Sequence, residues 1–143
     1  MAVESDGRQA RDAARWMAQA RHDLDSAEFS AQGGRHALAC FLCHQAAEKA
    51  VTAFLLSRGA EQVWGHALAD LCEDAMNFDP SFDFVKSAAV LLDKHYLGAR
   101  YPSGLPGGTP AEVYDDADSA HAIGIAQEVV SAVQKRIQDG ANT

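Results

Sequence analysis

One stretch of the chain decides its fold: residues 36–58, HALACFLCHQAAEKAVTAFLLSR. It contains neither glycine nor proline, the two residues that most readily interrupt a helix. Its side chains are apolar almost all round, which is typical of a helix enclosed by other helices. We therefore predict a central helix from His36 to Arg58, with the other segments packed around it.

A stripe of polar side chains interrupts the apolar surface of this helix on one side. The stripe consists of His44, Gln45, Glu48, Lys49 and Thr52. Their spacing places them on one helical face, which is either an outer edge or a polar site shared with neighbouring elements. His44 is either a general base, because histidine titrates near neutrality, or a hydrogen-bonding residue in an interface. Glu48 and Lys49 are either site residues or an exposed pair of charges.

The composition is that of an ordinary globular domain. The 143 residues are 48% apolar and 22% charged, and they suffice for one domain with a sizeable core. Alanine-rich segments with few β-branched residues favour an all-α fold. The net charge of −8 argues against bulk binding of nucleic acid and against a membrane-surface protein, because both need basic patches. We expect a single domain over residues 1–143, ordered from about residue 8 to about residue 138.

Cysteine usage and the absence of long apolar segments predict a cytoplasmic protein. Cys40, Cys43 and Cys72 fit a reducing compartment, and the N-terminal segment lacks the apolar core of a signal peptide. Cys40 and Cys43 share a helical face with His36 and His44, so they belong either to a metal site or to the core. Core packing is favoured because the chain offers no second ligand pair. We predict neither a metal nor a cofactor.

Four more helices are expected around the central one, over about residues 8–31, 66–76, 81–97 and 115–138. Gly33 and Gly34 end the first of them, and so short a break implies an antiparallel return. A connector over residues 60–65, which contains Trp64, leads to the third helix at His66. Apolar residues at helical spacing predict the buried faces of the outer helices. These faces are Ala13, Met17, Ala20, Leu24, Ala27 and Ala31 in the first helix, Val85, Ala88, Leu91, Leu92 and Tyr96 in the fourth, and Ala117, Ala120, Ile123, Gly124, Gln127, Val130, Val133 and Ile137 in the last.

A segment rich in glycine and proline separates the last two helices. Residues 98–109, GARYPSGLPGGT, hold four glycines and two prolines, so they form a loop, and long loops in small domains are often functional. Within it, Arg100 offers a planar fork for phosphate and Tyr101 a ring for stacking on a base. Alternatively, Arg100 pairs with a carboxylate and holds the loop in place. His66 either satisfies backbone groups at the start of its helix or belongs to a site.

Several segments, taken in order, resemble the HEPN domain family over about residues 16–135. These segments are WMAQARHDLDSAEF, CHQAAEKAVTAFLLSRG, HALADL, YLGARYP and VYDDADSAHAIGIAQEVV. The most specific parts are the Phe-x-x-x-Gln-Ala-Ala-Glu-Lys-Ala run at residues 41–50 and Ala-Arg-Tyr-Pro at residues 99–102. The resemblance implies an up-and-down four-helix bundle with a short additional helix, usually assembled as a homodimer.

Members of that family divide into two functional groups. Many are metal-independent ribonucleases in which four to six residues separate an arginine from the histidine that follows it; others bind nucleotides or act with a nucleotidyltransferase partner, as in toxin–antitoxin pairs. The chain departs from the ribonuclease pattern, because Leu105, Pro106 and Gly107 stand where a histidine is expected after Arg100. Arg15 and His22 have a similar spacing but lie in the first helix.

The sequence therefore favours a HEPN binding module for a nucleotide or a nucleotidyltransferase partner, without catalytic residues. The alternatives are a toxin-like ribonuclease with a displaced active site and a ligand-free dimeric adaptor. If a ligand site exists, we expect it where the glycine- and proline-rich loop meets the polar stripe. Its candidate residues are Arg100, Tyr101, Lys49, His66, His44 and Glu48.

Overall fold

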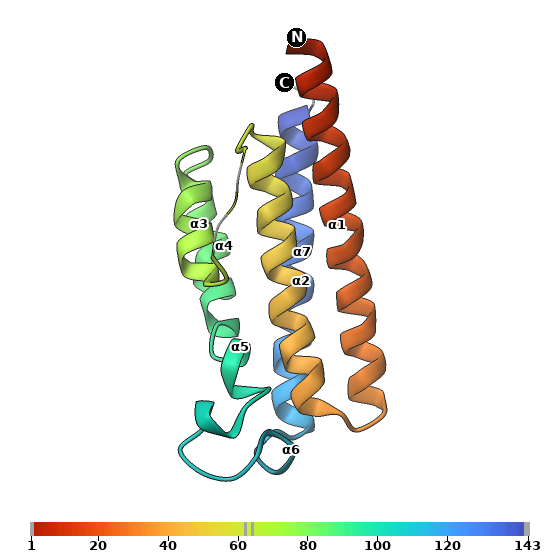
Figure 1. The fold of residues 1–143 in the computed structure, drawn as a ribbon, viewed down its shortest axis with the longest axis vertical. Helices are drawn as coiled ribbons and strands as arrows, with labels where there is room; N and C mark the ends of the chain where they lie inside the picture. Colours follow the sequence, from red (N-terminus) through yellow and green to blue (C-terminus); the bar gives the residue numbers. More distant parts are fainter. Residues whose placement is uncertain (1, 62, 64, 142–143) are drawn as a thin grey trace.

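Three long helices form the body of the fold. The computed structural model describes residues 2–61, 63 and 65–141, of which residues 2–6 are described as backbone only. Helices α1 (Ala2–Gln32), α2 (His36–Ser57) and α7 (Asp116–Ala141) lie side by side, and α1 begins at the end of the bundle where α7 finishes (Figure 1). The described residues contain no β-strand, so the all-α prediction is confirmed.

Shorter helices take the fourth position of the bundle, on the side of α2 away from α1 (Figure 1). They are α3 (Leu68–Met76), α4 (Phe82–Ala89), the 3₁₀ turn η1 (Val90–Leu92) and α5 (His95–Gly98), followed by the 3₁₀ turn η2 (Pro102–Gly104) and α6 (Pro110–Val113). The architecture is a helical bundle with short additional helices, as expected. No helix in the described part of the chain is both long enough and apolar enough to cross a bilayer.

The turn between α1 and α2 confirms the predicted glycine stop. Gly34 has a φ of +79°, in the left-handed region that a side chain disfavours. The Gly34 N–H donates to the Ala31 carbonyl at 3.0 Å, and the Arg35 N–H donates to the Ser30 carbonyl at 2.8 Å. These two bonds satisfy carbonyls at the end of α1 that otherwise lack partners, and they turn the chain directly into α2.

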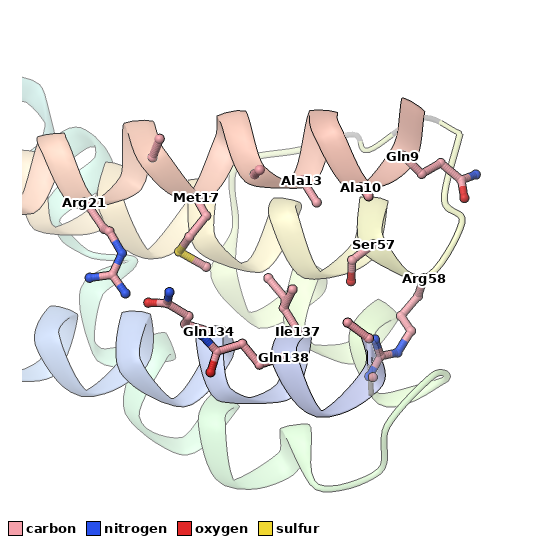
Figure 2. Close-up of a pocket in the computed structure, with 14 residues that line it drawn as sticks. Gln9, Ala10, Ala13, Met17, Arg21, Ser57, Arg58, Gln134, Ile137 and Gln138 are labelled. Atoms are coloured by element: carbon pink, nitrogen blue, oxygen red, sulfur yellow. The ribbon is translucent and has the colours of Figure 1, made fainter. Parts of the chain in front are cut away.

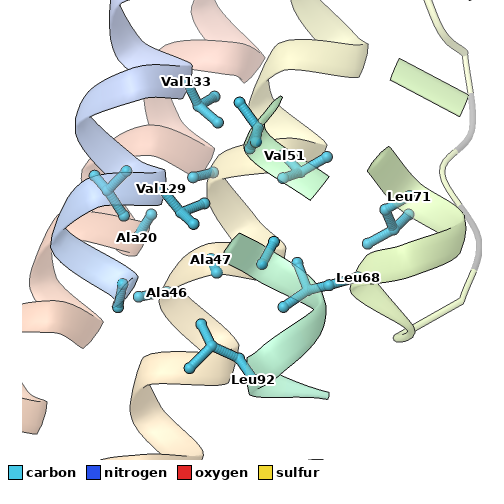
Figure 3. Packing of buried hydrophobic residues seen from close by; sticks show 14 of the residues in the cluster. Ala20, Ala46, Ala47, Val51, Leu68, Leu71, Leu92, Val129 and Val133 are labelled. Atoms are coloured by element: carbon cyan, nitrogen blue, oxygen red, sulfur yellow. The ribbon is translucent and has the colours of Figure 1, made fainter. Parts of the chain in front are cut away.

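The core lies around α2, with contributions from every long helix. Helix α2 buries thirteen of its residues, in agreement with its apolar sequence. Figure 3 shows Val51 of α2 among side chains from other helices, including Leu68, Leu92 and Val129. The rings of Phe54 and Phe82 are 4.3 Å apart, which ties α4 to α2.

The predicted fourth helix, residues 81–97, is wrong as a continuous element. It divides into α4, η1 and α5, although the backbone keeps right-handed helical angles at Val90, Asp93 and Lys94. In this region the Asp93 N–H donates to the Val90 carbonyl and the Tyr96 N–H donates to the Asp93 carbonyl, so the bonds span three residues instead of four. The tighter winding turns Leu91 outward, where it is 49% exposed rather than buried.

Two other predicted faces need correction. On α7 the buried residues are Ser119, Ala122, Ile125, Ala126, Val129, Val130 and Val133, whereas the predicted Ala117, Ala120, Gly124 and Gln127 are exposed. The N-terminal half of α7 therefore buries a different face from the predicted one. The sequence did not reveal this face, because alanine, glycine and serine give little periodic signal. On α1, Leu24 and Ala31 are only half-buried, and Asp23 is buried beside them.

Some helix boundaries also differ from the predictions. Helix α1 begins at Ala2 rather than near Arg8, α3 begins at Leu68 rather than His66, and α7 ends at Ala141 rather than Gln138. The predicted loop over residues 98–109 contains the single turn η2. Trp64, predicted to lie in the connector before α3, is outside the described residues.

Two phenylalanines of α4 provide a matched test of the core. Phe82 is fully buried and Phe84 is 71% exposed. We expect Phe82→Ala to lower the free energy of unfolding by about 3–5 kcal/mol, because it removes buried apolar surface and leaves a cavity. Phe84→Ala should change it by less than about 0.5 kcal/mol. Urea denaturation of both variants checks the prediction, and equal losses would contradict the packing described for α4.

Candidate functional site

The polar stripe of α2 is not an outer edge. His44 is completely buried, Glu48 is 8% exposed and Thr52 is 5% exposed, whereas Gln45 and Lys49 are half-buried. Burying a polar side chain costs free energy unless it finds partners. The partners of His44 and Glu48 come from the chain around α3 and α5, so this end of the stripe is a polar site shared with neighbouring elements.

Asp93 connects α2 to the start of α3. Its Oδ1 accepts a hydrogen bond from the Leu68 N–H at 2.7 Å, and its Oδ2 accepts one from the Ala69 N–H at 3.1 Å. These two amides open α3 and have no acceptor within their own helix. His44 Nε2 lies 3.2 Å from Asp93 Oδ1. Because a carboxylate oxygen accepts, we assign the proton of the neutral His44 ring to Nε2.

Glu48 stands between two histidines. Its Oε1 lies 2.6 Å from His66 Nδ1, and its Oε2 lies 3.8 Å from His44 Nδ1. Neither His44 Nδ1 nor Glu48 Oε2 has a hydrogen-bond partner among the described residues. The side chain of His44 is fully buried and that of His66 is 60% exposed, so the row that they form with Glu48 and Asp93 runs from the half-buried Asp93 through the interior to the surface at His66.

Tyr96 of α5 joins this row to the glycine- and proline-rich loop. The His66 ring stacks on Tyr96 with centroids 5.0 Å apart and an angle of 19° between the planes. The Arg100 guanidinium lies 4.6 Å from the centre of the same ring, and its Nε donates to the Tyr96 carbonyl at 2.7 Å. The guanidinium also lies 4.5 Å from the Phe41 ring and 5.0 Å from the Tyr101 ring.

The Arg100 side chain is therefore fixed by three aromatic rings and one backbone carbonyl. Its Nη1 and Nη2 have no hydrogen-bond or ion-pair partner among the described residues. Among the described residues, no carboxylate pairs with Arg100, so the structure does not support the alternative in which such a pair holds the loop in place. A positioned guanidinium with two open nitrogens has the geometry to accept a phosphate or carboxylate bidentately.

Lys49 belongs to a different contact. It forms an ion pair with Asp23 of α1, and the Gln19 side-chain amide donates to the other oxygen of Asp23 at 2.9 Å. The structure thus brings His44, Glu48 and His66 together and links them to Arg100 and Tyr101 through Tyr96. It directs Lys49 toward α1. Sequence reasoning missed Asp93, and it assigned Tyr96 to the apolar face of a helix.

The three cysteines are packed in the core. Burial raises the pKa of Cys40, Cys43 and Cys72 to about 12, so their thiols stay protonated and unreactive near neutral pH. Core packing is thus the interpretation that the structure supports for Cys40 and Cys43. Among the described residues, no group of three or more histidine, cysteine or acidic side chains is arranged to hold a metal ion.

Comparison with known proteins places the chain in a family. The model of the HEPN domain matches residues 13–137. The chain belongs to the HEPN domain family. A search of curated proteins finds no match to this HEPN chain.

Three solved structures are similar to this HEPN chain. TT1696 from Thermus thermophilus is 36% identical, with a TM-score of 0.81 over 87% of this chain and 97% of the other. ST0689, an archaeal HEPN homologue, is 35% identical, with a TM-score of 0.73 over 88% and 98%. A HEPN domain protein from Thermotoga maritima, tm0613, is 27% identical, with a TM-score of 0.69 over 87% and 98%. The similarity covers nearly the whole of each relative.

The arginine and histidine spacing of ribonuclease members has no counterpart at the loop of this HEPN chain. Arg15 and His22, which have a similar spacing, are both exposed on α1. Arg15 lies 3.6 Å from Asp12 on the same helix. Neither residue contacts the row of polar side chains around Glu48, so this pair is not part of the site.

Buried histidines should make the stability of this HEPN domain sensitive to pH. Burial is the main cause that lowers the pKa of His44, against the opposing charges of Glu48 and Asp93. His95 is 5% exposed, and its Nδ1 lies 2.9 Å from the Tyr114 hydroxyl. Burial, and to a smaller extent the positive charge of Lys94, lowers the pKa of His95 to about 4. Because both shifts are downward, acid protonates the unfolded chain first.

The folded state should therefore lose stability as the pH falls from about 6.5 to about 4, with His95 alone accounting for about 3 kcal/mol. In His95→Gln the difference in unfolding free energy between about pH 7 and about pH 4.5 should shrink. His22→Gln is the matched control, because His22 is exposed on α1, away from His95, and this variant should keep the wild-type difference. Urea denaturation at the two pH values measures it, and an unchanged difference in His95→Gln would contradict the assignment.

Proposed function

We propose that this HEPN domain is a binding module for a nucleotide, whose phosphate is held by Arg100. The observation that carries the proposal is the Arg100 guanidinium itself. Phe41, Tyr96 and Tyr101 surround it, its Nε is bound to the Tyr96 carbonyl, and its two terminal nitrogens have no partner among the described residues. An arginine fixed in this way loses little conformational freedom when a phosphate binds.

Charge supports an anionic ligand at this place. The chain carries eight more acidic than basic groups, so most of its surface repels anions. Among the described residues, Arg100 has no neighbouring carboxylate within ion-pair distance. Its positive charge is therefore available, whereas the cations of Lys49 and Lys86 are each paired with an acidic side chain.

Exposed rings beside Arg100 supply a surface for a base. Tyr101 is 49% exposed and adjoins the guanidinium, and His66 has an exposed ring stacked on Tyr96. Stacking of a base on an aromatic ring contributes roughly 1–3 kcal/mol, with little preference among bases. We therefore assign the phosphate to Arg100 and the base to the Tyr101 side of the site. The role of His44 is to hold Asp93 and Glu48 in place from the interior.

The nucleotide either diffuses freely or belongs to a nucleotidyltransferase partner, as the family suggests.

A homodimer also fits this chain. Leu38 on α2 is 49% exposed and Leu97 on α5 is 53% exposed. Phe41 also lies on α2, and Arg100 follows the end of α5. Exposed apolar side chains of this size often mark an interface. Light scattering should give a mass near twice 15.3 kDa; a monomer at micromolar concentration would contradict the dimer.

The phosphate assignment predicts the effect of one substitution. Arg100→Ala should weaken nucleotide binding about 10- to 150-fold, because a charge-assisted hydrogen bond contributes roughly 1.5–3 kcal/mol. Arg15→Ala is the matched control, since it removes the same charge from an exposed position on α1. Calorimetric titration of ATP, GTP and AMP into the three proteins measures the effect.

Each outcome of that titration decides between hypotheses. Equal affinity in the wild type and Arg100→Ala would remove Arg100 from the site while leaving nucleotide binding in place. An absence of binding in all three proteins would favour the ligand-free dimeric adaptor. Weaker binding in Arg15→Ala as well would show that the loss reflects overall charge rather than the stacked guanidinium.

A second candidate, a ribonuclease with a displaced active site, is favoured by one observation. Glu48 and the exposed His66 form a carboxylate–histidine pair at 2.6 Å, an arrangement that orients a general base. His44 is excluded from direct contact with RNA by its complete burial. We nevertheless expect no cleavage, because the family's histidine is absent from the loop after Arg100.

Incubation of the purified protein with labelled RNA, in the presence of a chelator, should leave the RNA intact. His66→Ala and Arg100→Ala should then behave like the wild type. Metal-independent cleavage that disappears in His66→Ala but persists in the exposed control His22→Ala would overturn the binding-module proposal and establish the ribonuclease.

A further inference from the structure

A concave site lies far along the bundle from Arg100, between the start of α1 and the end of α7. It is a groove of about 540 Å³, within the size range of small-molecule sites. Figure 2 shows the two helices as its walls and the end of α2 behind them. None of the residues that line it belongs to the Arg100 site. The groove is therefore an independent feature of the molecule.

The walls of this groove are mostly apolar. Ala13 and Met17 of α1 and Ile137 of α7 meet across it, and the exposed Ala14 and Ala18 lie on the α1 wall. Because alanine side chains are short, the space between the two helices stays open. An aliphatic chain bound here would contact both helices, so its apolar surface would be removed from water on two sides. Removal of apolar surface from water is the main favourable contribution to binding in such a site.

The charges that line the groove have a single sign. Its charged residues are Arg21 and Arg58, and no aspartate or glutamate is among the described residues that line it. This is unusual for a chain with a net charge of −8. The groove therefore favours an anion, and its ligand should be anionic as well as apolar.

The two arginines differ in how they are held. Arg58 Nη2 donates to the Arg136 carbonyl at 3.1 Å, and its guanidinium lies 4.7 Å from the centre of the Phe54 ring. Gly140 makes room for it, because a Cβ there would lie 1.9 Å from Arg58 Nη1. Arg21 is exposed and has no hydrogen-bond or ion-pair partner among the described residues. Figure 2 shows its side chain reaching from α1 toward α7.

We propose that this groove binds a single-chain amphiphile with an anionic carboxylate head, such as a fatty acid. The carboxylate binds the unpaired Arg21 guanidinium at the open end of the groove, where it also keeps contact with water. The aliphatic chain lies along Ala14, Met17 and Ile137 toward Arg58. Arg58 closes the other end and adds positive charge without giving up its bond to α7.

Dodecanoate and dodecyltrimethylammonium have the same tail and opposite charges, and so they separate the two parts of the proposal. Each is titrated calorimetrically into the full chain below its micelle concentration. Dodecanoate should bind once per chain, and the cation should bind at least about tenfold more weakly. Absence of saturable dodecanoate binding, or equal affinity for the two amphiphiles, would overturn the proposal.

Two exposed positions place the ligand within the groove. Arg21→Gln should weaken dodecanoate binding about tenfold, and Ala14→Leu, which fills the α1 wall, should weaken it by more than about tenfold. Arg15→Gln and Ala117→Leu are the matched controls, because both residues are exposed outside the groove and should leave the affinity unchanged. Equal losses in the variants and controls would contradict the assigned site.

The same variants distinguish a ligand from a second copy of the chain. Circular dichroism should confirm that Ala14→Leu stays folded, and sedimentation should show its mass unchanged. If Ala14→Leu instead alters the oligomeric state and the wild type binds no dodecanoate, the groove is an interface between copies and the ligand assignment is wrong.

Discussion

The Asp93 carboxylate is the contact on which the arrangement of this HEPN domain depends. It accepts the first amides of α3, at Leu68 and Ala69, and it faces the buried His44 of α2. Helix amides without acceptors and a buried imidazole without a partner would each cost free energy, so one carboxylate satisfies two demands. The tight winding around residues 90–96 brings Asp93 into this position. The same winding gives Tyr96 its place between His66 and Arg100.

The buried row and the surface site are parts of one structure. Glu48 is hydrogen-bonded to His66 and faces His44 on its other side. The His66 ring stacks on Tyr96, and the Arg100 guanidinium lies against the same ring. A guanidinium held by rings needs those rings to be fixed, and they are fixed by helices that Asp93 ties to α2. The polar stripe therefore supports the proposed phosphate site from the interior, without contact between its buried members and the ligand.

Much of the fold was predictable because long apolar periodicity and glycine stops are local signals. The central helix ends at Ser57, next to the predicted Arg58, and Gly34 ends α1 as expected. The broken fourth helix was not predictable, since Asp93 at the break bonds to α3, a contact between residues about 25 apart. For the site, the sequence identified Arg100, His66, His44 and Glu48 as candidates. It missed Asp93 and Tyr96, whose roles appear only when the helices are packed.

The central claim is that Asp93 fixes the ring of His44, with its proton on Nε2 and its Nδ1 directed toward Glu48. Nitrogen-15 chemical shifts of the histidine rings measure the protonated nitrogen directly, and Asp93→Asn assigns the effect to this carboxylate. At about pH 7 the account predicts a neutral His44 ring protonated at Nε2, because burial lowers its pKa. A neutral ring protonated at Nδ1, or a spectrum of His44 unchanged in Asp93→Asn, would contradict it.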